Sequence, residues 1–281
     1  MYNIICQLII YNKYIKERYG IGIMDTIIPN ANVILNTKGL CKNFRSGAHE
    51  QQVLKNLDIN IYGNDFTVIM GASGAGKSTL LYALSGMDRV SGGSVNFFDT
   101  AIESLNPDKL AVFRRKNCGF VFQQMFLLDN MSILDNILTC GLLVNRDKKA
   151  IVSYAKELLS KVGLTETIWR KFPSQLSGGE NQRAAIVRAL INRPRVVFAD
   201  EPTGSLNSAS GKAVLDVLTG INESGQNIIM VTHDLHSARR GNRILYISDG
   251  VICGECNLGK YVSGDTERHD KLQAFLMEMG W

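Results

Sequence analysis

Residues 71–79 of the chain, GASGAGKST, have the types and spacing of a loop that binds phosphate groups. They match the pattern G-x-x-x-x-G-K-[ST], with Gly71, Gly76, Lys77 and Ser78 at its fixed positions. Glycines let the backbone approach an anion closely, and several N–H groups at a helix N-terminus point toward it. We expect Lys77 to reach the β- and γ-phosphates and the Ser78 hydroxyl to bind Mg²⁺. The predicted phosphate loop comprises Gly71, Ala72, Ser73, Gly74, Ala75, Gly76, Lys77, Ser78 and Thr79.

The residues around this loop favour the structural context that the motif requires. FTVIM (66–70) before the loop is an apolar, β-type run, and LLYALSGM (80–87) after it suits a helix. The alternative is an ordinary glycine-rich turn with an incidental lysine. The order strand, loop, helix argues against it.

Two adjacent carboxylates, Asp200 and Glu201, end the run VVFADE (196–201), which otherwise suits burial on both faces. Such carboxylates are costly to place there unless a cation or a water molecule uses them. In open sheets of parallel strands, ligands bind at the carboxyl ends of the strands. We therefore expect Asp200 to bind Mg²⁺ and Glu201 to act as the general base that activates the attacking water. The alternative is a pair that merely caps a strand at the surface.

Two more apolar runs end in polar side chains that we expect in the same crevice. His233 ends NIIMVTH (227–233), and Gln123 follows GFVF (119–122). A lone histidine at such a place is more often structural, but here it could contact the γ-phosphate and orient the water. Gln123 is a neutral ligand able to reach Mg²⁺ or the attacking water.

The segment QLSGGENQRAAIVRAL (175–190) predicts a helix with an unusual first turn. Ser177 and Glu180 form the capping box S-x-x-E. A purely structural role as a helix cap would explain these two residues, which are half of the motif. Gly178 and Gly179 are poor helix formers and suit close approach of an anion or another backbone. Because the chain already has a phosphate loop, a second phosphate-binding helix end makes sense mainly if two copies meet.

The composition is that of an ordinary globular chain with ample capacity to form a core. The 281 residues are 45% hydrophobic and 20% charged, with a net charge of +5. No lysine- or arginine-rich block supports a nucleic-acid partner. No stretch approaches the roughly 20 apolar residues that a spanning helix needs. Six scattered cysteines fit reduced thiols in the cytosol.

Apolar runs of β-type alternate with helical patterns along most of the chain. This alternation predicts an α/β fold with a mostly parallel sheet covered on both faces. The stretch from about 106 to 172 is predicted to be helical, because apolar positions recur three and four residues apart. Residues 1–30 are expected to be a disordered N-terminal extension. The alternative for residues 1–23 is an amphipathic segment on a membrane.

Taken together, GASGAGKST, Gln123, LSGGE, VVFADEPTG and VTHD resemble the ATP-binding subunit of an ABC transporter. The resemblance covers roughly residues 31–255 in the family's order and spacing. LYALSGMDRVSGG, GFVFQQ and ADEPTG are similar to the branch of lipoprotein-release, macrolide-efflux and bacitracin-type peptide-antibiotic exporters. The ending ERHDKLQAFLMEMGW resembles that of bacitracin-type subunits.

The resemblance implies an ABC ATPase domain over 31–258 and a tail with a short helix over 259–281. It also implies a P-loop core, an antiparallel β subdomain and an inserted helical subdomain at about 106–172. The cofactors would be ATP and Mg²⁺, and two copies would sandwich ATP between one phosphate loop and the partner's Ser177, Gly178, Gly179 and Glu180. A separate membrane permease would hold the subunit at the cytoplasmic face of the cell membrane. The exported substrate would be an antimicrobial peptide or a similar amphiphile.

Two residues differ from the family's usual pattern. Phe44 stands where the family usually has a tyrosine that stacks on adenine, and phenylalanine keeps the aromatic face. Asn207 in SLN (205–207) stands where the family usually has aspartate. The loss of that charge leaves open how tightly the two sites are coupled.

Other classes of ATPase share these ATP-binding motifs. DNA-repair and chromosome-organising members insert a long coiled coil or a zinc module between the phosphate loop and LSGGE. Here Lys77 and Ser177 are only 177 − 77 = 100 positions apart, with no sustained heptads. A subunit that drives a membrane partner in cell-wall remodelling or signalling, without transport, stays open.

The segment QMFLLDNMSILDN (124–136) joins Gln123 to the helical stretch and holds several apolar residues close together. They could fill the core of the helical subdomain. In the family this junction lines the groove that receives a short cytoplasmic helix of the permease. We therefore expect Phe126 and Met131 to contact the permease.

Overall fold

The structure, a computed structural model, describes residues 32–47 and 49–281, and Val33–Trp281 form one compact unit. The extension expected over residues 1–30 lies outside the described residues. Within the described part of the chain, a search for helices long and apolar enough to cross a membrane finds none.

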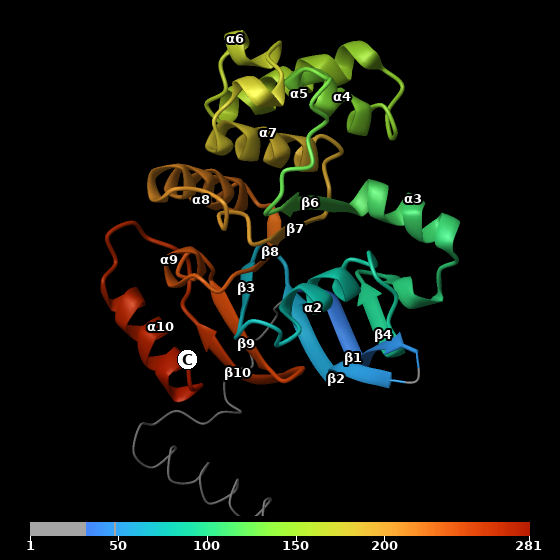
Figure 1. The fold of residues 1–281 in the computed structure, drawn as a ribbon, viewed down its shortest axis with the longest axis vertical. Coiled ribbons are helices and arrows are strands. Elements are labelled where there is room, and N and C mark those ends of the chain that lie inside the picture. The colour runs from blue at the N-terminus through green and yellow to red at the C-terminus, as the bar shows by residue number, and fades with distance from the viewer. Residues whose placement is uncertain (1–31, 48) are drawn as a thin grey trace, which may run out of the picture. The chain divides into compact units, whose positions relative to one another are not determined.

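A six-stranded sheet forms the centre of this unit, in the strand order β10-β9-β3-β8-β7-β6 (Figure 1). Its strands are β3 (Phe66–Met70), β6 (Cys118–Phe122), β7 (Val196–Asp200), β8 (Asn227–Val231), β9 (Arg243–Ser248) and β10 (Val251–Asn257). The strands from β9 to β6 run parallel, and β10 runs antiparallel to β9. The mostly parallel sheet predicted from the sequence is therefore present.

The sheet is buried on both faces, which explains its continuous apolar strands. In β7, Val197 and Ala199 pack into one core cluster, whereas Val196 and Phe198 pack into another. Because side chains alternate along a strand, a run that is apolar at every position needs cover on both faces.

A second, antiparallel sheet has the order β2-β1-β4-β5. Its strands are β1 (Val33–Ser46), β2 (His49–Tyr62), β4 (Gly92–Phe97) and β5 (Thr100–Ala101). Helix α2 (Lys77–Leu84) contacts β1, β2 and β4 of this sheet. It also contacts β7 and β8 of the central sheet. The helix that follows the phosphate loop is thus fixed between two sheets.

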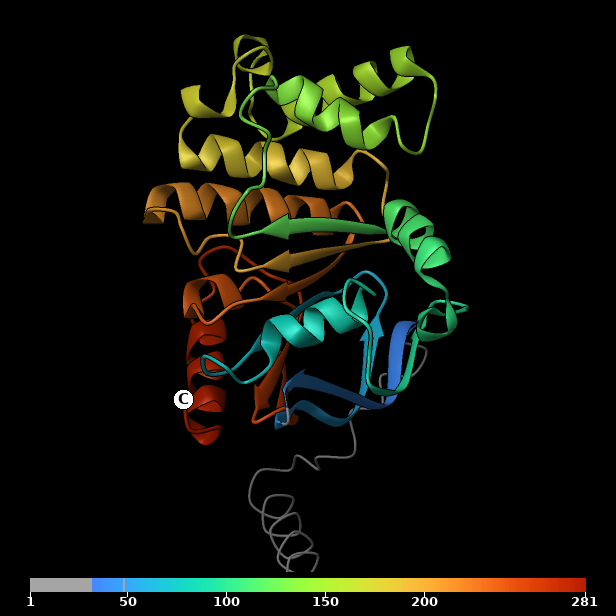
Figure 2. The same ribbon diagram turned by 45° about the vertical axis from the view of Figure 1, so that its right-hand side comes forward.

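Helices cover the other face of the central sheet in two successive layers (Figure 2). α7 (Gly178–Leu190) and α8 (Ser208–Glu223) form the first, and α7 also packs on α4 (Ile133–Gly141) and α5 (Lys148–Lys161). The remaining helices are α3 (Pro107–Asn117), α6 (Glu166–Trp169), α9 (Leu235–Ala238) and α10 (Glu267–Glu278). The short helix expected within 259–281 is α10.

The stretch 106–172 differs from its prediction because it is not helical throughout. It contains β6, which pairs in parallel with β7 at the edge of the central sheet. Helix α3 contacts β6, and its Leu110 packs into the core cluster around α2. The partner that makes residues 118–122 a strand lies far away in the sequence, so local periodicity does not show it.

Candidate functional site

The phosphate loop runs from the end of β3 to the start of α2, in the context that the motif predicts. Gly71 has φ 155°, and a Cβ there would lie 2.1 Å from the carbonyl oxygen of Ile247 in β9. Gly76 is the N-cap of α2 with φ 102°, and a Cβ there would lie 3.1 Å from the Leu54 side chain. Both positions need glycine because other strands pack directly against the loop.

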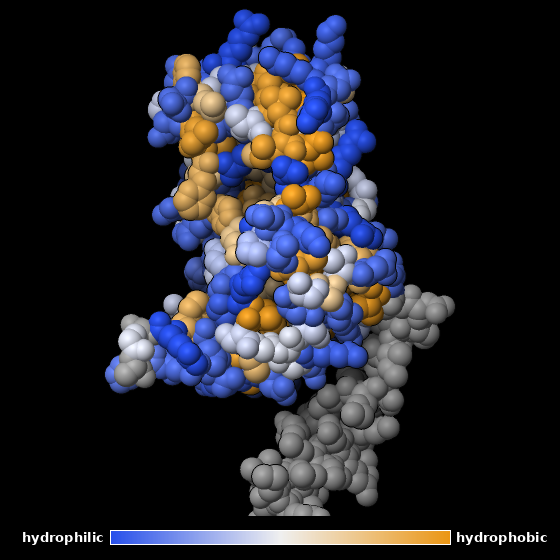
Figure 3. All heavy atoms as spheres, turned by 90° about the vertical axis from the view of Figure 1, so that its right-hand side faces the viewer, coloured by the Kyte–Doolittle hydropathy of each residue, from blue (hydrophilic) through white to orange (hydrophobic). Residues whose placement is uncertain are grey.

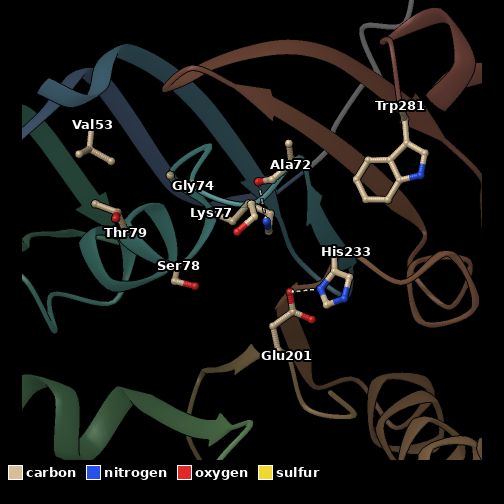
Figure 4. A pocket seen from close by; sticks show the side chains of 11 residues that line it. Val53, Ala72, Gly74, Lys77, Ser78, Thr79, Glu201, His233 and Trp281 are labelled. Carbon is tan, nitrogen blue, oxygen red and sulfur yellow. Dashed lines mark hydrogen bonds and ion pairs between the residues drawn. The ribbon is translucent and has the colours of Figure 1, made fainter. Parts of the chain in front are cut away.

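A pocket of about 740 Å³ opens beside this loop (Figure 4). Its lining combines main-chain and side-chain groups of the loop with two polar side chains from the ends of β7 and β8. The lining residues are Val53, Ala72, Ser73, Gly74, Gly76, Lys77, Ser78, Thr79, Glu201, His233 and Trp281. The structure thus brings together most of the predicted phosphate loop with the predicted base and the predicted histidine.

The Lys77 side chain is held over its own loop. Its Nζ donates hydrogen bonds to the carbonyl oxygens of Gly71 and Ala72, each at 2.9 Å, and the residue is 9% exposed. Burial lowers the pKa of Lys77, although the nearby Glu201 and Asp200 act in the opposite direction. The ammonium group is thus in place beside the pocket.

Asp200 lies directly beside Ser78. The Ser78 hydroxyl donates to Asp200 Oδ1 at 2.9 Å, and the Tyr82 hydroxyl donates to Asp200 Oδ2 at 2.6 Å. Burial, together with this hydrogen bond to a carboxylate, raises the pKa of Tyr82, which therefore remains a donor. A hydroxyl and a carboxylate oxygen at this distance are ligands of the kind that Mg²⁺ prefers.

Glu201 and His233 form a pair at the ends of β7 and β8. His233 Nδ1 and Glu201 Oε1 lie 2.8 Å apart, and the glutamate side chain is 17% exposed against 66% for the histidine. Glu201 adopts φ 47°, and its N–H donates to the carbonyl of Val231 at 3.0 Å. A non-glycine residue at positive φ is uncommon, and such strain concentrates at functional sites.

Gly71, Ala75 and Asp200 are not among the residues lining the pocket as described, although they adjoin residues that are, and Phe44 and Gln123 do not line it either. Phe44 is 46% exposed on β1, and Lys42 Nζ lies 4.8 Å from its ring centroid. The Gln123 side chain lies against Gly204, where an added Cβ would approach its Nε2 to 2.9 Å. Ser205 Oγ donates to the Gln123 carbonyl at 3.2 Å. Gln123 is thus linked to the loop that follows Glu201.

The segment Ser177–Glu180 opens α7 with the predicted capping box. Ser177 N donates to Glu180 Oε2 at 2.8 Å, and Glu180 N donates to Ser177 Oγ at 3.3 Å. The Ser177 hydroxyl also donates to Glu180 Oε2 at 2.7 Å, and this bond, with the one from Ser177 N, lowers the pKa of Glu180. A Cβ on Gly179 would lie 2.9 Å from the Ser210 side chain, so α8 packs against this turn. Within the described lining, this segment does not reach the chain's own pocket.

Three residues that sequence reasoning missed contribute to the site. Tyr82 orients Asp200, and Trp281 lines the pocket. Gln182 is fully buried in α7, where its Nε2 donates to the carbonyls of Phe122 and Pro202 at 2.9 and 2.8 Å. It thereby joins the ends of β6 and β7. Tyr82, Gln182 and Trp281 contact residues that are distant in the sequence, so no local motif identifies them.

Comparisons with known proteins agree with this geometry. The family model described as "ABC transporter" matches residues 54–204. The chain is 42% identical to the "Uncharacterized ABC transporter ATP-binding protein MJ1508" of Methanocaldococcus jannaschii, over 78% of this chain and 97% of the relative. It is 39% identical to the bacitracin export ATP-binding protein BceA of Halalkalibacterium halodurans, over 80% of this chain and 89% of the relative.

Another relative is longer than this chain. The macrolide export ATP-binding/permease protein MacB of Psychrobacter arcticus is 39% identical over 79% of this chain, which spans only 33% of that relative. Among solved structures, the dimeric ATP-binding cassette MJ0796 is 36% identical with a TM-score of 0.74, over 81% of this chain and 100% of that one. A post-hydrolysis dimer of the same cassette, bound to ADP and Pi, has a TM-score of 0.73 at 35% identity. The fold and the motifs therefore agree with one assignment: the chain belongs to the ABC transporter family.

Proposed function

We propose that this chain binds and hydrolyses ATP to power a membrane ABC transporter. The observation that carries the proposal is one pocket lined by the phosphate loop and the Glu201–His233 pair, with Asp200 hydrogen-bonded to Ser78 of that loop. ATP phosphates would lie along the loop, with Lys77 facing the β- and γ-phosphates. Mg²⁺-dependent release of phosphate from ATP by the purified chain tests this proposal.

The chain's own residues divide the chemistry between them. Glu201 would take the proton of the attacking water, and His233, 2.8 Å from that carboxylate, would orient the water and contact the γ-phosphate. Ser78 and Asp200 would hold Mg²⁺, with Gln123 as a further ligand, and the ion would neutralise phosphate charge. Ser177–Glu180 would complete the site in a second copy of the chain, because they do not reach their own chain's pocket.

Truncation of Phe44 should weaken ATP use mainly through binding. If its exposed ring stacks on adenine, Phe44→Ala removes a contact made equally in the ground and transition states, so KM should rise while kcat changes little. Base–aromatic stacking contributes about 1–3 kcal/mol in nucleic-acid binders, which corresponds to about 5–150-fold in KM. Steady-state kinetics measure both constants. Phe44→Tyr keeps the aromatic face and should retain the original KM; an unchanged KM in Phe44→Ala would exclude the stack.

A permease contact is supported by the loop that follows Gln123. Phe126 is 62% exposed and Leu128 is 52% exposed, so neither fills the core. The loop is nevertheless fixed: Arg188 donates to the carbonyls of Met125 and Phe126, and Asn136 donates to that of Leu128. On the face drawn in Figure 3, hydrophobic surface gathers mainly in the upper part of the unit, where α4 and α5 lie in Figure 1. An exposed apolar patch on a rigid loop suits protein docking.

Phe126→Asp and Met131→Asp should therefore weaken association with the permease, because docking would bury an unpaired charge. Co-purification with the permease and nucleotide binding by the isolated subunit are the two measurements. ATP binding should survive in both variants. Val262→Asp is a matched control, since Val262 is also 62% exposed but precedes α10. Intact complexes in both variants would refute the contact, and lost ATP binding would instead favour a core-filling role.

The substrate proposal is an antimicrobial peptide or a similar amphiphile. It rests on the similarity to BceA and on the ending ERHDKLQAFLMEMGW. The similarity to the macrolide export protein MacB points instead to a macrolide. The permease would hold the subunit at the cytoplasmic face of the membrane. Stimulation of ATPase activity in proteoliposomes by a bacitracin-type peptide, against a macrolide, distinguishes the two substrates.

A further inference from the structure

Trp281 lines the same pocket as the phosphate loop, Glu201 and His233. In Figure 4 its indole lies beyond His233, on the other side of Lys77 from Val53. The ring therefore lies at the His233 end of the pocket. The roles proposed above do not use it.

Contacts with the core hold the indole in this place. The main-chain N–H of Trp281 donates to the Leu276 carbonyl at 3.0 Å, and the ring packs edge-to-face on buried Tyr246 with centroids 6.4 Å apart. Leu272 and Leu276 of α10 are 0% and 1% exposed. The position of the ring is therefore built into the fold.

Arg268, at the start of α10, fixes the helix to the loop before β9 and to the segment after β10. The residue is 4% exposed. Its guanidinium donates to the main-chain carbonyls of Arg239, Gly241, Leu258, Gly259 and Lys260. Because a buried guanidinium needs acceptors for its donors, these carbonyls make α10 an integral part of the unit.

Trp281 as a whole residue nevertheless remains 46% exposed. A single exposed apolar side chain is ordinary on a protein surface. This one differs because it is rigidly held at the rim of a binding pocket. Rigid tryptophans are also enriched among the residues that dominate interface energies.

We propose that Trp281 belongs to the interface between two ATP-bound copies of this chain, where its indole packs against the second copy. The inference rests on the proposed function. The occupant is a second copy because Ser177–Glu180 do not reach the pocket of their own chain, so a copy must approach this pocket to deliver them. Trp281 lines the same pocket, so its indole would lie next to the Ser177–Glu180 segment's docking place. The solved relative MJ0796 is itself dimeric.

The first experiment measures ATP-dependent dimerisation in the hydrolysis-blocked Glu201→Gln background, by sedimentation with Mg²⁺ and ATP. Trp281→Ala should raise the Kd of the dimer at least about tenfold, as truncation of a packed interface anchor does. Nucleotide affinity of the single subunit should stay within about twofold. Met277→Ala is the control, because Met277 lies on α10, is 65% exposed and is not among the residues lining the pocket as described. It should leave the dimer Kd unchanged.

The second experiment follows the indole itself. The chain has two tryptophans, and Trp169 is 9% exposed with its Nε1 donating to the Leu164 carbonyl. With Trp169→Phe, emission comes from Trp281 alone and should shift to the blue when Mg²⁺ and ATP are added. With Trp281→Phe, the remaining emission should not shift.

The outcomes separate this inference from the function on which it rests. Failure of the parent Glu201→Gln chain to dimerise would refute the ATP sandwich itself. A parent that dimerises, with Trp281→Ala dimerising equally tightly or Trp281 emission unchanged, would overturn only the interface role. A tenfold loss of nucleotide affinity in the single-subunit Trp281→Ala chain would make Trp281 a nucleotide contact, which also overturns it.

Discussion

Replacing Glu201 with glutamine should leave ATP binding intact and lower the rate of hydrolysis about 10²–10⁴-fold, the usual cost of losing a general base. Glutamine has the same shape and can still hydrogen-bond His233, which lies 2.8 Å from the carboxylate. Lys77 and the phosphate loop are untouched by the change. The substitution therefore removes proton acceptance and little else.

Steady-state phosphate release and equilibrium ATP binding measure the two quantities separately. The variant should accumulate as an ATP-bound dimer, because the sandwich forms but is not resolved by hydrolysis. Glu223→Gln, at the exposed end of α8, is the matched control and should hydrolyse ATP normally. Near-normal turnover in Glu201→Gln would exclude Glu201 as the base.

Replacing Lys77 with alanine should act one step earlier, on binding itself. Lys77 is 9% exposed as a residue, and two carbonyls at 2.9 Å fix its ammonium group beside the pocket. Hydrogen bonds to charged groups contribute about 1.5–3 kcal/mol, so loss of this one to the phosphates should weaken ATP affinity roughly 10–100-fold. Hydrolysis should fall with occupancy.

Calorimetric titration of ATP into the variant measures that affinity. Lys148→Ala removes the same charge from the exposed first turn of α5 and should bind ATP as the parent does. Thermal unfolding checks that the loop survives without the two hydrogen bonds. Unchanged affinity in a folded Lys77→Ala chain would show that the phosphates lie elsewhere.

The sequence alone predicted the local parts of this site. Glycines at positive φ, a lysine and a hydroxyl at fixed spacing, and a capping box are all properties of a few consecutive residues. The strand–loop–helix context at 66–87 was predicted for the same reason, and the structure confirms it with β3 and α2. The α/β architecture also followed, because a strand that is apolar at every position requires cover on both faces.

Some features could have been predicted from the sequence but were not, or only in part. The hairpin of β9 and β10 turns at Asp249-Gly250, where both residues have positive φ, and Asp-Gly is a strong signal for a tight hairpin. The segment Cys118–Phe122 was expected to end at the crevice like the other apolar runs, yet it was also counted within the helical stretch 106–172. Parallel pairing with β7 makes it a strand.

Only the tertiary structure decided which distant residues complete the pocket. Tyr82 reaches Asp200 because α2 is packed between two sheets, and Trp281 lines the pocket because Arg268 and two buried leucines dock α10. Phe44 and Gln123 have the expected motifs, yet they lie outside the described pocket lining. Motif spacing specifies chemistry along a short segment of chain. Contacts between segments far apart in sequence depend on how sheets and helices pack, and no local pattern records them.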